Sequence, residues 1–161
     1  MTASDATILG LGVPVKYDGQ TYTLGPLNLE DCSYFSTWLE ERAWQGHERS
    51  ARHMTPDKVE ARANALELAI GAGVYEFPAP LFVQGVQSLA GLKRMALIAL
   101  RTNVPQTTEE FAGELVAERF EEVAKAIGVL LSDPKEMMRR SLGGPARRGG
   151  AASPTPNSSA S

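Results

Sequence analysis

Residues 13–45 constrain the fold most, because they predict a short β-hairpin that leads into an aromatic-rich helix. Apolar and polar residues alternate over 13–17, which is the period of a half-buried strand, and residues that favour strands follow over 21–24. Between them, Asp18-Gly19 supplies the two positive-φ positions of a type I′ turn. An isolated hairpin is only marginally stable in water, so we expect this one to pack on the helices that follow.

Start and stop signals in the next part of the chain predict two helices. Asn28 precedes an acidic turn and is expected to cap the first helix, in which Gly46 either ends or interrupts the pattern. Thr55-Pro56 predicts the start of the second helix, with a capping hydroxyl followed by proline at the first helical position. The apolar stripe of this second helix consists of residues at helical spacing, namely Val59, Ala63, Leu66 and Ile70.

Two further segments complete the predicted helices. Residues 81–101 are the most hydrophobic segment and are expected to form one helix at the centre of the core. A helical segment then begins after Thr108 and is expected to divide at Gly113. Its later half carries an amphipathic stripe made of Phe120, Val123, Ile127 and Leu130.

The predicted organisation is one mainly α domain of four to six helices with an N-terminal β-hairpin. We expect a flexible arm over 1–12 and the folded domain over 13–142. The remainder, 143–161, consists largely of Gly, Ser, Pro and Ala without any large apolar residue, so we expect a disordered tail there.

Charge and composition narrow the classes of function. The formal net charge of -3 argues against nucleic-acid binding through a broadly basic surface. The single cysteine, Cys32, excludes an internal disulfide framework and is typical of a reducing compartment. The first ten residues lack the basic and apolar regions of a signal peptide, and no apolar run is long enough to cross a membrane. We therefore expect a soluble cytoplasmic protein.

No pattern in the sequence predicts catalysis. Cys32 with His47 or His53 is the one nucleophile–base pairing that residue type allows, and a helix over 29–45 would hold Cys32 and His47 about 22 Å apart at ~1.5 Å per residue. The two histidines do not share a helical face, and the closely spaced Cys and His sets of metal sites are missing from the sequence. We expect a protein that is not an enzyme and that uses no metal or cofactor.

Five aromatic residues are the candidate partner-binding residues. They lie on the first helix and near the proline-rich turn that follows the second: Tyr34, Trp38, Trp44, Tyr75 and Phe77. Aromatic side chains are enriched at the centres of protein interfaces, and a domain of this size cannot bury all five on one stripe. Two interpretations stay open, since these residues either hold the β-hairpin on the helices or face a partner.

The order of these elements resembles the tail assembly chaperones of long-tailed bacteriophages, over residues 13–131. The resemblance lies in a Tyr-Thr-Leu-x-Pro-Leu strand end at 22–27, a hydrophobic helix ending in Ala-Leu-Arg at 99–101, and a Pro-x-Thr-Thr-Glu-Glu-Phe helix start at 105–111. It implies a non-enzymatic protein of the host cell cytoplasm that binds the tape measure protein and assists assembly of the tail tube protein. It also implies a possible homo-oligomer or a longer frameshifted form as a partner. Membrane binding is not implied, and nucleic acid is an improbable partner.

Two other classes of function stay open at this point. A virion structural protein, such as a head–tail connector or a tail-completion adaptor, has a similar size and helical content. A small helical DNA-binding regulator is the third class, although Arg42, Arg49 and Arg52 make only a sparse basic patch.

Overall fold

The computed structural model describes residues 12–143, which hold one two-stranded sheet and seven α-helices. The predicted mainly α fold with an N-terminal β-hairpin is confirmed. In chain order the elements are β1 (Val13–Tyr17), β2 (Gln20–Leu24), α2 (Leu29–Ala51), α3 (Pro56–Gly71), α4 (Pro80–Gln87), α5 (Leu89–Arg101), α6 (Glu109–Glu118), α7 (Phe120–Leu131) and α8 (Pro134–Gly143). The predicted arm and tail lie outside the described residues, apart from Gly12 and Gly143.

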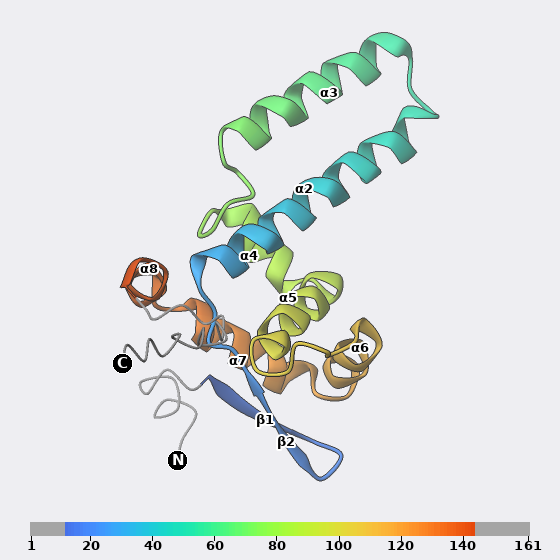
Figure 1. Ribbon diagram of the computed structural model, residues 1–161. Helices are drawn as coiled ribbons and strands as arrows, with labels where there is room; N and C mark the ends of the chain where they lie inside the picture. The colour runs from blue at the N-terminus through green and yellow to red at the C-terminus, as the bar shows by residue number, and fades with distance from the viewer. Residues whose placement is uncertain (1–11, 144–161) are drawn as a thin grey trace, which may run out of the picture.

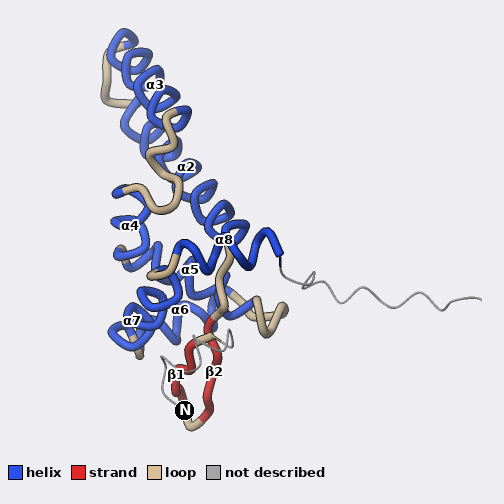
Figure 2. Tube along the Cα trace, turned by 90° about the vertical axis from the view of Figure 1, so that its left-hand side faces the viewer, coloured by secondary structure: helices blue, strands red, loops and turns tan. Residues whose placement is uncertain are grey.

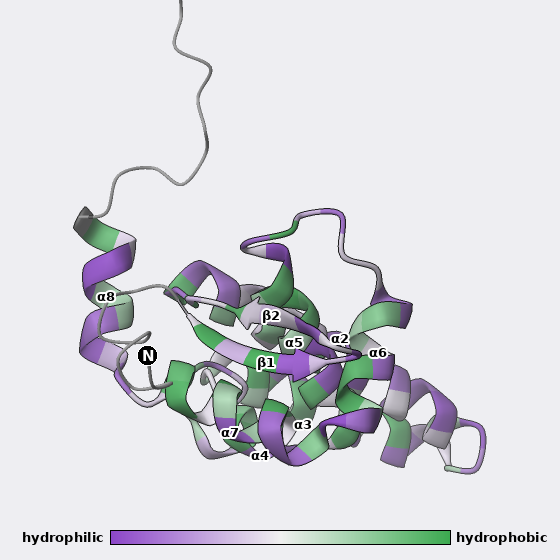
Figure 3. Cartoon of the chain, turned by 90° about the horizontal axis from the view of Figure 1, so that it is seen from below, coloured by the Kyte–Doolittle hydropathy of each residue, from purple (hydrophilic) through white to green (hydrophobic). Residues whose placement is uncertain are grey.

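The β-hairpin has the turn that its sequence predicts. β1 pairs with β2 in antiparallel register, with Tyr17 opposite Gln20, and both turn residues, Asp18 and Gly19, have positive φ angles of 48° and 71°. Buried and exposed residues alternate along β1, and the hydropathy colours alternate in the same way (Figure 3). The buried face packs on α5 and α7, because β1 contacts α7 and β2 contacts α5.

The first helix is longer than its pattern required. Asn28 caps α2 through a capping box in which its side chain accepts from the Asp31 N–H at 2.9 Å, as predicted. α2 then continues through Gly46 to Ala51, so this glycine does not end the helix. α3 begins at Pro56, but the Thr55 hydroxyl makes no capping hydrogen bond.

Two predicted boundaries were wrong. The single helix expected over 81–101 is divided at Ser88, whose extended backbone ends α4 and whose hydroxyl accepts from the Gly91 N–H at 3.0 Å to cap α5. A Cβ at Gly91 would collide with the carbonyl of Gly85, so the two helices meet at a bend that needs glycine. Arg119, rather than Gly113, divides the next segment.

The break at Arg119 also changes the last predicted stripe. Val123, Ile127 and Leu130 are buried as expected, whereas Phe120 is 41% exposed. Phe120 is the first residue of α7, directly after the change in chain direction, and the periodicity of the stripe does not extend to that position. The amphipathic pattern of α7 is therefore confirmed from Val123 onward only.

The described chain has two parts that differ in burial. The body, defined as residues 12–42 and 80–143, contains the sheet, the start of α2 and helices α4 to α8. The projecting helix pair, defined as residues 43–71, consists of the end of α2 and the antiparallel α3, and both views show it extending away from the body (Figures 1 and 2). All buried hydrophobic residues of the core lie in the body.

Candidate partner-binding surface

The seam between α2 and α3 is an apolar surface that the described chain covers on one side only. The predicted stripe of α3 is half-buried along its length, while its neighbour Leu68 is 75% exposed. No residue of α3 is buried. Among the elements of residues 12–143 with extensive contacts, α3 contacts α2 alone. Within residues 12–143 the stripe thus has α2 on one flank and no third helix in extensive contact with it.

A hollow of about 460 Å³ lies in this seam. α2, α3 and the connection after α3 contribute its lining, which consists of Ala43, Gly46, His47, Arg62, Ala65, Leu66 and Tyr75. Three of these residues are alanine or glycine, and a Cβ placed on Gly46 would meet no atom within 4 Å. Small side chains therefore leave the space that a larger side chain of a partner would fill.

His47 is the one buried residue of the projecting helix pair. It is 7% exposed, and its Nδ1 atom has no hydrogen-bond partner among the described residues. Trp44 packs edge-on against its ring, with 5.7 Å between ring centroids. A buried polar atom without a partner costs about 1–3 kcal/mol of stability. The unpaired Nδ1 atom therefore lowers the stability of this part of the seam.

The structure places the five predicted aromatic residues in two pairs and one separate residue. Tyr75 lines the hollow, and Trp44 lies beside its histidine. Trp38 and Phe77 pack on core residues of the body: Trp38 lies 5.4 Å from Phe35 and Phe77 lies 5.3 Å from Phe82, measured between ring centroids. Tyr34 is 59% exposed and donates from its hydroxyl to Glu30 at 3.1 Å.

Other aromatic residues hold the β-hairpin on the helices. Phe111 of α6 lies 4.9 Å from Tyr22 and 6.1 Å from Tyr17, measured between ring centroids. The rings of Trp38, Trp44 and Phe77, in contrast, contact Phe35, His47 and Phe82, none of which belongs to the β-hairpin. The sequence did contain a signal for the true cluster, because Tyr17 and Tyr22 fall on the strand positions that face inward.

Cys32 and His47 do not form a catalytic pair. Both lie on the same continuous helix, fifteen residues apart, and a rise of ~1.5 Å per residue separates them by about 22 Å. Cys32 is 2% exposed, and burial together with the nearby Asp31 carboxylate raises the pKa of its thiol to about 12. Its role in the structure is that of a small core residue.

Within 12–143 no group of three or more His, Cys, Asp or Glu residues is arranged to hold a metal ion. No helix in that range is long and apolar enough to span a bilayer. The chain matches no protein-family model, no curated protein and no solved structure.

Proposed function

We propose that this protein is a phage tail assembly chaperone, which binds a helical segment of the tape measure protein in the seam between α2 and α3. In this role it is not an enzyme, acts in the host cell cytoplasm, and keeps its client soluble while the tail tube assembles. The proposal joins the resemblance over residues 13–131 to one observation, the half-buried seam of the projecting helix pair.

The seam supports this proposal because it has the form that helix-in-groove recognition requires. Such recognition places the apolar face of an amphipathic helix on an apolar strip, with anchor side chains three and four residues apart. The stripe of α3 has that spacing, and a third helix laid over it would complete the burial that α2 begins. Fully burying one leucine side chain contributes about 1.5–3 kcal/mol, so Leu66 and Ile70 alone offer a useful binding free energy.

The hollow supports a knob-into-hole contact within the same groove. A partner side chain entering it would rest on Ala43, Gly46 and Ala65 and contact the ring of Tyr75. Arg62 lies on the lining and makes no ion pair within the described residues. It is therefore available to an acidic residue of the client next to the anchor.

The test replaces Ala65 with arginine in the full chain and uses co-purification with the tape measure protein of the same phage. Ala65 is exposed and lines the hollow, so Ala65→Arg should fold normally and block the anchor. We expect the yield of bound client to fall at least about tenfold, equivalent to one anchor side chain lost. Trp38→Ala is a poorer choice, because Trp38 packs on the core residue Phe35.

Asn64→Arg is the matched control, since Asn64 is the adjacent exposed residue of α3 and does not line the hollow. It should retain the client. If Ala65→Arg retains the client equally well while its circular dichroism and thermal midpoint are unchanged, the seam is not the binding site. If the unaltered protein does not bind the tape measure protein at all, the proposed function itself is wrong.

A further inference from the structure

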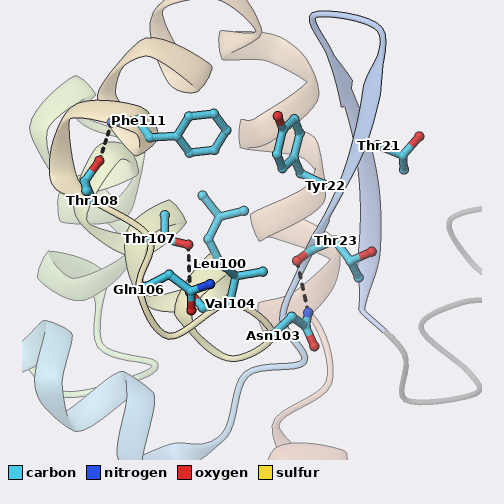
Figure 4. Close-up of a pocket in the computed structure, with 10 residues that line it drawn as sticks. All are labelled: Thr21, Tyr22, Thr23, Leu100, Asn103, Val104, Gln106, Thr107, Thr108 and Phe111. Atoms are coloured by element: carbon cyan, nitrogen blue, oxygen red, sulfur yellow. Dashed lines mark hydrogen bonds between the residues drawn. The ribbon is translucent and has the colours of Figure 1, made fainter.

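A groove of about 670 Å³ lies between β2 and the connection from α5 to α6. Two half-buried rings belong to its apolar part, those of Tyr22 and Phe111, which lie 4.9 Å apart between centroids and face each other in Figure 4. Val104 adds aliphatic surface and is 44% exposed. The described residues therefore leave aromatic and aliphatic surface partly open here.

The polar lining of this groove carries no charge. It consists of four threonines and two carboxamide residues, namely Thr21, Thr23, Thr107, Thr108, Asn103 and Gln106. The Asn103 amide is already engaged, since it donates to the carbonyls of Thr23 at 3.0 Å and Gly25 at 2.6 Å. Gln106 is exposed and its side chain makes no hydrogen bond within residues 12–143, so its amide can donate to an occupant.

These features fit an uncharged segment that contains proline. A polyproline II segment makes no internal hydrogen bonds, and aromatic-lined grooves bind such segments because fixing them costs little entropy. The chain carries one at 153–157, Ser-Pro-Thr-Pro-Asn, and no charged residue occurs over 149–161. The arginine pair at 147–148 is a poor occupant, because the Arg101 guanidinium lies beside the groove and donates to the Thr107 carbonyl at 3.0 Å.

The end of α8 is connected to the groove by a short series of contacts. The Ser141 hydroxyl accepts from the Leu29 N–H at 3.2 Å, and the Gly25 carbonyl accepts from Asn103 at one end of the groove. Leu29 and Gly25 are four residues apart. With ~3.8 Å between successive Cα atoms, this route from Gly143 to Asn103 measures at most about 35 Å.

The sequence after α8 is long enough to cover that distance. Pro154 follows Gly143 by eleven residues, which span about 34 Å in polyproline II at ~3.1 Å per residue and somewhat more when fully extended. Residues 153–157 are therefore the part of this uncharged stretch that arrives at the Asn103 end of the groove.

We propose that residues 153–157 bind in this groove of the same chain as a polyproline II segment, with their two prolines on the rings of Tyr22 and Phe111. Polyproline II has three residues per turn, so two prolines separated by one residue present one continuous apolar face. A carbonyl of the segment accepts from the Gln106 amide. A proline-containing segment of another protein can then enter only by displacing this one. The groove is separate from the seam that receives a helix, and neither proposal depends on the other.

Paramagnetic relaxation in the full ¹⁵N-labelled chain tests the proposal. Ser158→Cys places a nitroxide label directly after the segment, and Cys32 does not compete for the label because it is 2% exposed and the pKa of its thiol is raised to about 12. We expect the label to broaden the amide signals of Thr21, Gln106 and Phe111. A mixture of spin-labelled chain without ¹⁵N and unlabelled ¹⁵N chain should show no such broadening, because the contact lies within one molecule.

Matched substitutions in the spin-labelled chain test both sides of the contact. Pro154→Ala together with Pro156→Ala should remove the broadening, whereas Pro145→Ala, which changes a proline outside the segment, should keep it. On the groove side, Val104→Asn should lower the ratio of bound to free segment about fivefold, because an apolar contact is lost. Val83→Asn is the control, since Val83 is 43% exposed on α4 and does not line the groove.

Three outcomes would overturn the proposal. The first is an absence of broadening at Thr21, Gln106 and Phe111 in the spin-labelled chain. The second is broadening that persists when both Pro154 and Pro156 are alanine, because the prolines would then not be what the groove binds. The third is broadening that appears equally in the mixed sample, because the occupant would then be the segment of a second copy.

Discussion

The body and the projecting helix pair share one helix, yet they bury their residues very differently. The first half of α2 buries Cys32 and Phe35 in the core, whereas His47 is the one buried residue of its second half. Around the first half lie α4, α5 and α8, whereas the second half has extensive contact only with α3. The same helix is therefore a core element at one end and half of a partly covered surface at the other.

This difference shows that an apolar stripe on a helix does not determine whether another element packs against it. The stripe of α3 and the stripe of α7 have similar spacing, but α7 buries four residues and α3 buries none. α7 lies against α5, α6 and β1, and α3 lies against α2 alone. The apolar residues of α3 thus have more surface left for a partner to bury than those of α7.

The largest expected contrast is between two leucine-to-alanine substitutions. Leu115 is fully buried in the body, so Leu115→Ala should lower the free energy of unfolding by about 2–5 kcal/mol. Leu66 is half-buried in the seam, so Leu66→Ala should cost about 1 kcal/mol or less. Urea denaturation followed by circular dichroism measures both. Equal losses would show that a further element covers the seam in solution.

Leu68→Ala provides the baseline for that experiment. Leu68 is 75% exposed, so its truncation should change the free energy of unfolding by no more than about 0.5 kcal/mol. A larger loss would place Leu68 in an interface between copies of this chain, and the loss would then depend on protein concentration.

The local features of the fold were predictable, because nearby residues determine them. The turn at Asp18-Gly19 and the cap at Asn28 need only their own neighbours, and both are confirmed. The division at Ser88 was missed because periodicity continues across it, and only the close approach of Gly85 and Gly91 requires the bend. A close contact of this kind between two helices produces no periodic pattern in the sequence from which it could be predicted.

The candidate surface was predictable in residue type and not in arrangement. Trp38 and Trp44 are six residues apart on α2, so they lie on different sides of the helix, and one contacts the core while the other contacts His47. The hollow was not predicted, because its lining combines α2, α3 and Tyr75. The connection between two helices determines which of their residues meet. The sequence pattern of each helix alone does not predict this.

The buried thiol gives a second contrast, which is measured by pH. The pKa of Cys32 is about 12 in the folded protein, against an ordinary value of about 9. Above pH 9 the unfolded chain loses the thiol proton while the folded protein keeps it. The free energy of unfolding therefore falls as pH rises, by about 1.4 kcal/mol between pH 8 and pH 10. Urea titrations at the two pH values measure this loss.

Cys32→Ala is the control, because lysine and tyrosine residues titrate in the same pH range. The fall in the free energy of unfolding that this variant still shows between pH 8 and pH 10 is the part due to those residues. The difference between the two proteins isolates the thiol. Leu66→Ala should keep the full loss with pH, since α3 does not cover Cys32. A thiol that titrates near 9 in the folded protein would contradict the burial of this part of α2.

The smallest contrast concerns the caps at the starts of α2 and α3. The Asn28 side chain accepts from the Asp31 N–H, and the Asn28 N–H donates in return to the Asp31 carboxylate, each at 2.9 Å. Asn28→Ala should therefore cost about 1 kcal/mol. The Thr55 hydroxyl makes no such bond, so Thr55→Ala should cost only a few tenths. Both costs are read from urea midpoints at equal m-value.

Hydrogen exchange locates these two losses and so tests the division of the molecule directly. Asn28 starts the helix half that lies in the body, so Asn28→Ala should speed exchange of the slowest amides, which open only with global unfolding. Thr55→Ala should speed exchange in α3 alone, because α3 opens without breaking the core. If Thr55→Ala also speeds exchange in α5, the projecting helix pair and the body unfold as one unit. The seam would then owe its stability to the core, and α3 would be less free to adjust to a helical client.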